Sequence, residues 1–332
     1  GGHVFVYRHL PLLFGASYML LETHDPKNGA SIVYRTNTGA RTGAAEKMRA
    51  YIQARGFDAV VCVHVFPAAA MTYLRKTYGV QWRQYFVATD YTCSPGTGDA
   101  QMDAFFTPHS LLREEFASCG VPEERQIATG IPVAARFLQR TSAAEAKKAL
   151  GLPEDRRVLL MMSGSMGAGP IGKLVWRMSQ RLPKDAELVV ICGRNEKLRR
   201  QLASRPYQNV RILGYTTQVD LYMDAAELIL TKAGGLSSTE ALMKRLPIVY
   251  LNAVPGCETR NRDFLCREGC AITVNGVEKL AGATVHLLED PERLARMRQN
   301  IEEKFRMRAA DDIAAALIRV HEHDQQRGTL ET

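Results

Sequence analysis

The chain has 332 residues, of which 46% are hydrophobic and 23% are charged, and it carries a formal net charge of +8. This length suffices for two domains that each bury a core, and the composition is that of an ordinary globular protein rather than a disordered one. The mild positive charge permits attraction to an anionic membrane surface or to a nucleotide. No dense Lys/Arg run indicates nucleic-acid binding, so we expect none.

The seven cysteines are scattered along the chain, and none of them forms a Cys-x-x-Cys pair. The histidines show no zinc-binding spacing either, so we expect no metal site. Unpaired thiols are typical of a reducing compartment, which favours a cytoplasmic location.

The most apolar early stretch is Val4–Leu21, and Arg8, His9, Pro11 and Gly15 interrupt it. It is too broken for a helix that spans a membrane. We expect a core or surface helix in this place.

Residues 44–129 alternate between helical and strand patterns, which predicts a parallel, doubly wound sheet. Because chemistry in such sheets collects at the carboxyl ends of strands, polar residues at those ends are candidate functional residues. His64, Asp90 and His109 occupy such positions. His64 is equally compatible with a buried strand histidine, and Asp90 with a helix or turn cap. The expected strands are 57–65 (buried), 84–88, 104–107 and 126–129, and the expected helices are 44–55, 67–77 and 111–119.

A second α/β pattern begins with a buried strand at 157–163, followed by a glycine loop at 164–169 and a helix at 171–181. The loop does not have the Gly-x-Gly-x-x-Gly spacing of dinucleotide-binding folds, and no acidic residue ends the next strand. This argues against an NAD enzyme. The pattern continues with strands at 187–192 and 210–213 and a helix at 218–225.

The stretch from Glu227 to Asn261 carries the strongest signal. A buried strand at 228–231 runs into Lys-Ala-Gly-Gly. Ser237, Ser238 and Thr239 are expected to open a helix with Glu240 in its first turn. Such a junction points backbone N–H groups at one spot and favours a phosphate there. Glu240 is then placed to accept hydrogen bonds from a ribose diol, and Glu258 and Asn261 to reach sugar hydroxyls. The same residues also fit a helix start without a ligand, in which Gly-Gly is the helix entry, the serines are caps and Glu240 interacts with the helix dipole.

The C-terminal region, residues 291–322, is predicted to form two helices. We expect three segments: a first domain over 1–140, a second over 141–308, and a last helix over 309–332 that crosses back to the first domain.

The order of these motifs resembles family 28 glycosyltransferases. In the second half the matching motifs are Lys-Ala-Gly-Gly, the hydroxyl-rich helix start with Glu240, and Pro-Gly-x-Glu-x-x-Asn. In the first half they are CVHVFPA, ATDY, FFTPHSLLREEFASCGVP and ATGIPV. The resemblance is greatest to the processive diacylglycerol glucosyltransferases and the monogalactosyldiacylglycerol synthases. It implies a GT-B fold, with two Rossmann-like, doubly wound parallel-sheet domains that face a cleft.

The resemblance also implies the parts of a UDP-sugar site in the second domain. Arg194 is placed to neutralise diphosphate charge. Its position after a strand also fits a surface arginine at a turn. Cys257 replaces the Gln that is common in the family, which leaves the identity of the sugar open among glucose, galactose and N-acetylglucosamine. The matching residues are Gly164, Ser165 and Gly167 in the diphosphate loop, Tyr215 and Thr216 at the uracil, Gly234, Gly235, Leu236 and Ser237 in the second phosphate turn, Glu240 at the ribose, and Glu258 and Asn261 at the sugar.

The family's opening strand and Gly-x-Gly-His loop, which carries its candidate base, has no counterpart here, so we expect the first domain to be incomplete. His64 and Asp90 are stand-ins by position. The implied activity is inverting transfer of a hexose from a UDP-sugar to diacylglycerol at the cytoplasmic membrane face. No metal or cofactor is expected, and attachment to an anionic membrane is expected to be peripheral, with Val4–Leu21 as a candidate segment. The alternatives are a non-catalytic UDP-sugar-binding protein or donor half of a split enzyme, and an N-acetylglucosamine transferase for another lipid-linked acceptor.

Overall fold

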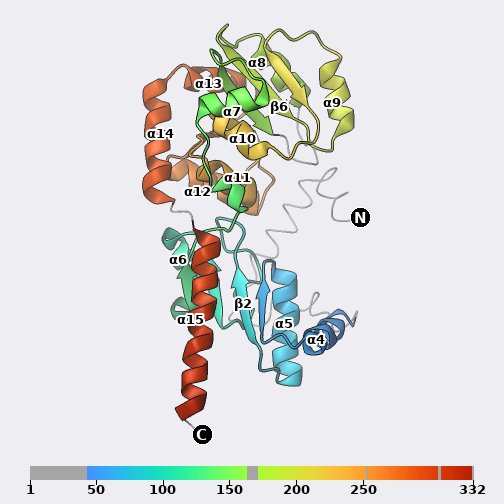
Figure 1. Ribbon diagram of the computed structural model, residues 1–332, viewed down its shortest axis with the longest axis vertical. Helices are drawn as coiled ribbons and strands as arrows, with labels where there is room; N and C mark the ends of the chain where they lie inside the picture. Colours follow the sequence, from blue (N-terminus) through green and yellow to red (C-terminus); the bar gives the residue numbers. More distant parts are fainter. Residues whose placement is uncertain (1–42, 163–170, 252, 306–307, 331–332) are drawn as a thin grey trace. The chain divides into compact units, whose positions relative to one another are not determined.

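The computed structural model describes residues 43–162, 171–251, 253–305 and 308–330. The chain divides into two compact α/β units (Figure 1). One unit contains the described residues up to Pro132 together with the C-terminal helix, and the other contains Val133–Phe305. The segment Val4–Leu21 lies outside the described residues. Within the described residues, no helix is both long enough and apolar enough to cross a membrane.

The unit that ends at Pro132 holds a parallel sheet with the strand order β1-β2-β3-β4. The four strands follow one another across the sheet in chain order. This order is the usual result when strands and helices alternate along the chain. The strands are β1 (Ala59–Cys62), β2 (Arg83–Val87), β3 (Ala104–Thr107) and β4 (Gln126–Ala128), and the helices are α4 (Ala44–Arg55), α5 (Val65–Tyr78), α6 (Arg113–Ser118) and α15 (Ala309–Leu330), with 3-10 turns at Ser110–Leu112 and Glu123–Arg125.

Strand β1 differs from the prediction of a buried strand over 57–65. It has four residues, and Val61 and Val63 are 42% and 55% exposed. Within the described residues β1 pairs with β2 alone. An apolar run predicts burial on both faces, but it cannot show whether a strand has one neighbour or two.

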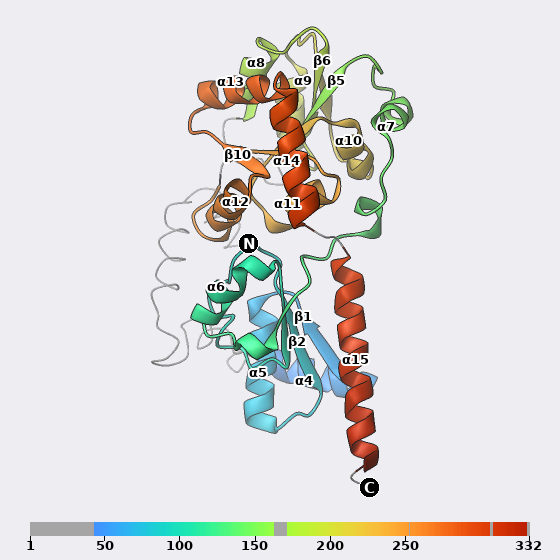
Figure 2. The same ribbon diagram turned by 90° about the vertical axis from the view of Figure 1, so that its left-hand side faces the viewer.

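Helix α15 packs on this sheet. Its residues Ile313 and Ala316 join a buried cluster with Tyr85, Val87 and Phe106 of strands β2 and β3. Figure 2, which is turned by 90° from Figure 1, also shows α15 lying along the sheet. The apolar residues recur at the three- and four-residue spacing that places side chains on one helix face. The last helix therefore supplies core to the unit formed by the beginning of the chain.

The unit Val133–Phe305 is built on a parallel sheet of order β10-β9-β8-β5-β6-β7. Its strands are β5 (Arg157–Met162), β6 (Ala186–Ile191), β7 (Val210–Leu213), β8 (Leu228–Thr231), β9 (Ile248–Tyr250) and β10 (Ala271–Thr273). Its helices are α7 (Ala143–Leu150), α8 (Ile171–Ser179), α9 (Glu196–Ala203), α10 (Val219–Ala225), α11 (Gly235–Met243), α12 (Cys257–Arg267), α13 (Val277–Leu288) and α14 (Pro291–Lys304).

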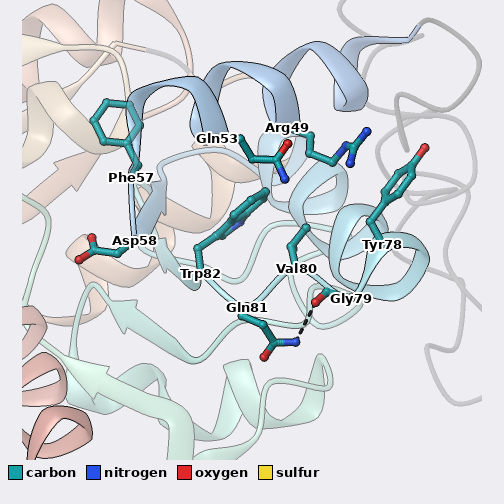
Figure 3. A pocket seen from close by; sticks show the side chains of 9 residues that line it. All are labelled: Arg49, Gln53, Phe57, Asp58, Tyr78, Gly79, Val80, Gln81 and Trp82. Carbon is teal, nitrogen blue, oxygen red and sulfur yellow. Dashed lines mark hydrogen bonds between the residues drawn. The ribbon is translucent and has the colours of Figure 1, made fainter. Parts of the chain in front are cut away.

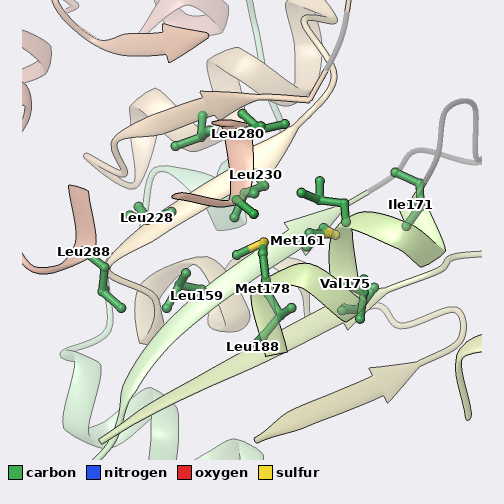
Figure 4. Packing of buried hydrophobic residues seen from close by; sticks show 14 of the residues in the cluster. Leu159, Met161, Ile171, Val175, Met178, Leu188, Leu228, Leu230, Leu280 and Leu288 are labelled. Atoms are coloured by element: carbon green, nitrogen blue, oxygen red, sulfur yellow. The ribbon is translucent and has the colours of Figure 1, made fainter. Parts of the chain in front are cut away.

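The core of this unit surrounds strand β5, whose central residues are fully buried. Leu159 and Met161 of β5 pack with Met178 of α8, Leu230 of β8 and Leu288 of α13 (Figure 4). Strands covered by helices on both faces of a sheet read as continuous apolar runs, which is why β5, β6 and β8 are recognisable in the sequence. The strand order reverses at β5, since the chain continues to β6 on one side while β8 lies on the other.

Candidate functional site

The reversal of strand order at β5 marks where a ligand binds in sheets of this kind, outside the carboxyl ends of the strands. Two loops flank that point. The loop after β5 contains the predicted residues Gly164, Ser165 and Gly167, which lie outside the described residues. The loop after β8 is Lys232–Gly234, and it leads directly into α11.

The N-terminus of α11 is open to a ligand. Gly234 is its N-cap residue and supplies no side-chain hydrogen bond. The first backbone bond that closes the helix runs from Ser238 N–H to the Gly234 carbonyl, at 3.0 Å. The N–H groups of Gly235, Leu236 and Ser237 precede it, in the first turn, where a helix has no carbonyl of its own to offer them. These N–H groups and the helix dipole together form an anion site.

Lys232 adds a positive charge beside this helix end. A Cβ atom built on Gly234 would lie 3.7 Å from the Lys232 Nζ. Such a distance is ordinary van der Waals contact, so the ammonium group lies close to the helix N-terminus. It is also paired with the Glu258 carboxylate at 2.7 Å.

The structure corrects the predicted start of this helix. It begins at Gly235 rather than at Ser237, and Glu240 lies in the second turn, not the first. The hydroxyls expected to open the helix are buried instead: Ser238 Oγ lies 2.8 Å from Tyr250 Oη, and Thr239 Oγ1 donates to the Gly235 carbonyl at 2.8 Å. These two hydroxyls stabilise the fold and do not face a ligand.

Glu240 is a half-buried carboxylate, one helical turn beyond Ser237 on the accessible side of α11. Burial raises the pKa of Glu240 to about 7, and the nearby guanidinium of Arg136 partly opposes that shift. Among the described residues, none donates a hydrogen bond to this carboxylate. A desolvated acceptor of this kind is stabilised when a ligand brings hydroxyl donors.

Glu258 lies in the first turn of α12, next to the turn at Gly256, whose φ of +113° favours glycine. One carboxylate oxygen of Glu258 accepts from Lys232 Nζ at 2.7 Å, and the other accepts from the Val254 N–H at 3.2 Å. Glu258 therefore links the loop after β8 to the loop after β9. The thiol of Cys257 is half-buried beside it.

Asn261 is buried beside the loop after β8. Its side chain is fully buried, and its Nδ2 donates to the Ala233 carbonyl at 3.0 Å. The amide thus holds the Lys232–Gly234 loop against α12. Its contact with a sugar stays a prediction.

Arg194 and Tyr215 lie together after β6 and β7. The Arg194 guanidinium carbon is 5.6 Å from the centre of the Tyr215 ring, and 66% of the Tyr215 side chain is exposed. Thr216 Oγ1 accepts from the Gln218 N–H at 3.1 Å, at the start of α10. A flat exposed ring held by an arginine is a suitable surface for an aromatic base.

In the other unit, His64 and Asp90 interact electrostatically after the ends of β1 and β2. His64 is the N-cap of α5, and its Nδ1 accepts from the Phe66 N–H at 3.2 Å. Desolvation of the imidazole lowers the pKa of His64, and the Asp90 carboxylate opposes this shift. His109 has a capping role of the same kind, with Nδ1 accepting from the Leu111 N–H at 3.2 Å.

Family models match both units. Residues 4–133 match the model for monogalactosyldiacylglycerol (MGDG) synthase, and residues 158–313 match the glycosyltransferase family 28 C-terminal domain. The chain belongs to glycosyltransferase family 28.

A relative of known activity and two solved structures are also similar to this chain. A processive diacylglycerol beta-glucosyltransferase from Bacillus cereus (strain AH187) is 26% identical over 276 residues, which cover 82% of this chain and 70% of the relative. Acinetobacter baumannii MurG has a TM-score of 0.59 and 15% identity, covering 83% of this chain and 77% of MurG. A UDP-GlcNAc 2-epimerase from Neisseria meningitidis bound to UDP-GlcNAc has a TM-score of 0.65 and 16% identity, covering 84% of this chain and 81% of the epimerase. The predicted GT-B fold is confirmed.

Two residues near the site are not among those predicted from the sequence. Lys232 lies beside the α11 N-terminus, and Arg136 lies near Glu240. Lys232 follows directly on a buried strand, a position that marks functional residues in parallel sheets. Arg136 lies in a 3-10 turn (Ala135–Phe137) about a hundred residues before Glu240, and no spacing in the sequence indicates their proximity.

Proposed function

We propose that this family 28 protein transfers a hexose from a UDP-sugar to diacylglycerol. The observation that carries the proposal is the half-buried Glu240 carboxylate, which lies one turn from the uncapped N-terminus of α11. A diphosphate needs the positive end of a helix, and a ribose needs a hydroxyl acceptor a short distance away. The name of the Bacillus cereus relative supports diacylglycerol as the acceptor.

In this proposal, the leaving UDP is stabilised by the chain itself. The first-turn N–H groups of α11 bind the diphosphate, and the Lys232 ammonium neutralises charge that develops on it. Tyr215 and Thr216 hold the uracil, Arg194 neutralises diphosphate charge, and Glu240 holds the ribose. Attack on the anomeric carbon from the face opposite the leaving group inverts its configuration.

The reaction is proposed to need no metal. The first-turn N–H groups and the dipole of α11 are proposed to carry the charge of the leaving diphosphate instead. Calorimetry with UDP in the presence of EDTA tests the donor site. We expect saturable binding that added magnesium leaves unchanged, whereas binding that appears only with magnesium would refute the proposal.

The acceptor hydroxyl needs a base, and we propose His64, with Asp90 stabilising its protonated form. Because the pKa of His64 is lowered, the imidazole is neutral near pH 7 and able to accept a proton. In the structure, Nδ1 of His64 accepts a hydrogen bond from the Phe66 N–H, so Nδ1 carries no proton. Proton uptake at Nε2 requires the other tautomer, with the proton on Nδ1, and that tautomer loses the capping bond.

We further propose peripheral attachment to the cytoplasmic face of an anionic membrane, since diacylglycerol resides in the bilayer and the chain carries a net charge of +8. Co-sedimentation with vesicles tests this. Binding should increase with the fraction of anionic lipid and decrease as salt screens the charges. Binding that ignores both variables would contradict the electrostatic part of the proposal.

A further inference from the structure

The surface pocket beside α4, on the unit with strands β1–β4, has a volume of about 560 Å³ (Figure 3). Two hydrogen-bond donors next to it, Trp82 Nε1 and Arg49 Nε, have no partner within the described residues. Both atoms are shielded from solvent, so a ligand in the pocket cannot reach them. The buried polar groups that bear on the proposed reaction lie in the other unit, at the end of α11.

An ion pair between Lys244 and Asp224 is almost completely buried there. The two side chains are 1% and 3% exposed, and Lys244 Nζ lies 2.6 Å from Asp224 Oδ2. Lys244 directly follows α11, and Asp224 lies in α10. Burying two charges is costly, and their attraction recovers the cost only when further hydrogen bonds are made to both groups. The other partners of the pair therefore indicate what it does.

Both charged groups bind the backbone of one segment, residues 139–141. Lys244 Nζ donates to the Gln139 carbonyl, and Asp224 Oδ2 accepts from the Thr141 N–H at 3.3 Å. Because these partners are backbone atoms, the bonds fix the path of the chain. The ion pair thus holds this segment against α10 and the end of α11.

The segment leads back to Arg136, which lies three residues before Gln139 in the 3-10 turn Ala135–Phe137. The turn is closed by a bond from the Phe137 N–H to the Ala134 carbonyl, at 2.9 Å. The Phe137 side chain is 1% exposed, so a buried ring anchors the turn. An anchored turn that is also held at Gln139 allows the backbone at Arg136 little movement.

The same segment runs along the face of α11 that carries Glu240. Glu240 and Lys244 are four residues apart, which places two side chains on one helix face. The Lys244 N–H donates to the Glu240 carbonyl at 3.3 Å, so the helical path continues to Lys244. Arg136 acts on Glu240, and the Gln139 carbonyl binds Lys244. Two positions three residues apart on the segment therefore meet two positions one turn apart on α11.

The charges near the ion pair leave Arg136 as the group that matters at Glu240. Arg140, between the two bonded residues of the segment, is partly buried, and burial lowers its pKa. In the part of the chain that the structure describes, the charge that acts on the Glu240 carboxylate is the Arg136 guanidinium. The other charged groups around Arg140 are paired with one another, Arg245 with Glu302 and Arg298 with Glu227.

We propose that Lys244 and Asp224 are positioning residues of the donor site, whose ion pair keeps the Arg136 guanidinium beside the Glu240 carboxylate. This inference rests on the proposed contact between Glu240 and the ribose. The guanidinium favours the ionised carboxylate, which can accept hydrogen bonds at both oxygens. Lys244 and Asp224 act through Arg136 and need not touch UDP.

A double variant removes the pair without leaving a buried charge. In Lys244→Met with Asp224→Leu, apolar side chains of similar size replace both charges, a change that is often neutral for stability. Its melting temperature and circular dichroism report whether it folds. If it does not fold, Asp224→Asn, which keeps the shape of the side chain and an acceptor for the Thr141 N–H, takes its place.

Calorimetry with UDP between pH 6 and pH 9 gives the readout. The pKa of Glu240 is about 7, and a nearby cation lowers it, so an Arg136 that is no longer held should let this pKa rise. The pH at which UDP affinity is half-maximal should then increase, and affinity at pH 7 should fall about threefold. A loss of packing alone would weaken binding at every pH without moving the midpoint.

Arg136→Gln tests whether the pair acts through Arg136. This residue is exposed, and its replacement should reproduce the shift of the midpoint. Added to the double variant, it should cause no further change, because both substitutions remove the same interaction. Asp185→Asn is the control: it breaks the Arg157–Asp185 ion pair at the amino ends of β5 and β6 and should leave the pH profile unchanged.

Two results would overturn the positioning role. One is a folded double variant with the UDP affinity and pH profile of the wild-type protein. The other is a full additional loss when Arg136→Gln is added to the double variant. Failure of the proposed ribose contact is recognised separately, since Glu240→Gln would then have the wild-type pH profile.

Discussion

Replacing His64 by Ala should lower kcat for glycolipid formation by about 10²–10⁴-fold, the usual contribution of a general base. The affinity for UDP should not change, because His64 lies in the unit that does not contain the α11 site. Product formation with a radiolabelled UDP-hexose under single-turnover conditions measures the chemical step, and calorimetry measures UDP binding.

The capping bond of His64 requires a matched control. His64→Ala also removes an N-cap, which costs about 0.5–2 kcal/mol of stability. His64→Asn keeps an N-cap acceptor but cannot act as a base at neutral pH. If the Asn variant retains full activity, the role of His64 is structural. If Asp90→Asn lowers kcat more than His64→Asn does, Asp90 is the base instead.

The second large effect is expected at Glu240. Glu240→Ala should weaken UDP binding by about 1–3 kcal/mol, the range for hydrogen bonds to a charged group. The half-buried carboxylate has no donor among the described residues, so the ribose would supply the donors that satisfy it. The 2′,3′-dideoxy analogue of UDP should bind the wild-type protein weakly and should be insensitive to the substitution. Equal losses for UDP and this analogue would contradict a ribose contact.

The pH dependence of UDP binding gives an independent check on Glu240. Its pKa is about 7 without ligand, and donors from a ribose favour the ionised form. Bound UDP should therefore lower this pKa, so that affinity increases as pH rises through 7 and levels off above about 8. The phosphate of UDP titrates near pH 6 as well, and Glu240→Gln provides the reference. A Gln variant with the same pH profile as wild type would show that Glu240 does not contribute.

Much of the fold follows from apolar runs in the sequence. The strands at Ala104–Thr107 and Leu228–Thr231 have the predicted bounds, because strands buried on both faces are rich in apolar residues. The strand at Val210–Leu213 also has its predicted bounds, although its residues are only partly buried. The helix Ala44–Arg55 also has its predicted bounds, since Gly56 ends it in a left-handed conformation.

The details of the site depended on tertiary contacts that a single sequence does not contain. Ser237 has the residue type of a helix cap, yet Gly235 already begins the helix. Asn261 has the polarity of a sugar ligand, yet the carbonyl of Ala233, 28 residues away, satisfies its amide. Residue types indicated a phosphate and sugar site, whereas burial and partners decided which polar groups remain available to a ligand.

The most direct test of the central claim is product analysis by mass spectrometry. The protein is incubated in EDTA with vesicles that contain diacylglycerol and with UDP-glucose, UDP-galactose or UDP-N-acetylglucosamine in separate reactions. We predict a glycosyl-diacylglycerol from at least one UDP-hexose, with inverted anomeric configuration, and its loss in Glu240→Ala. Saturable UDP binding without any glycosyl-diacylglycerol product would contradict the transferase account and favour a non-catalytic UDP-sugar-binding protein.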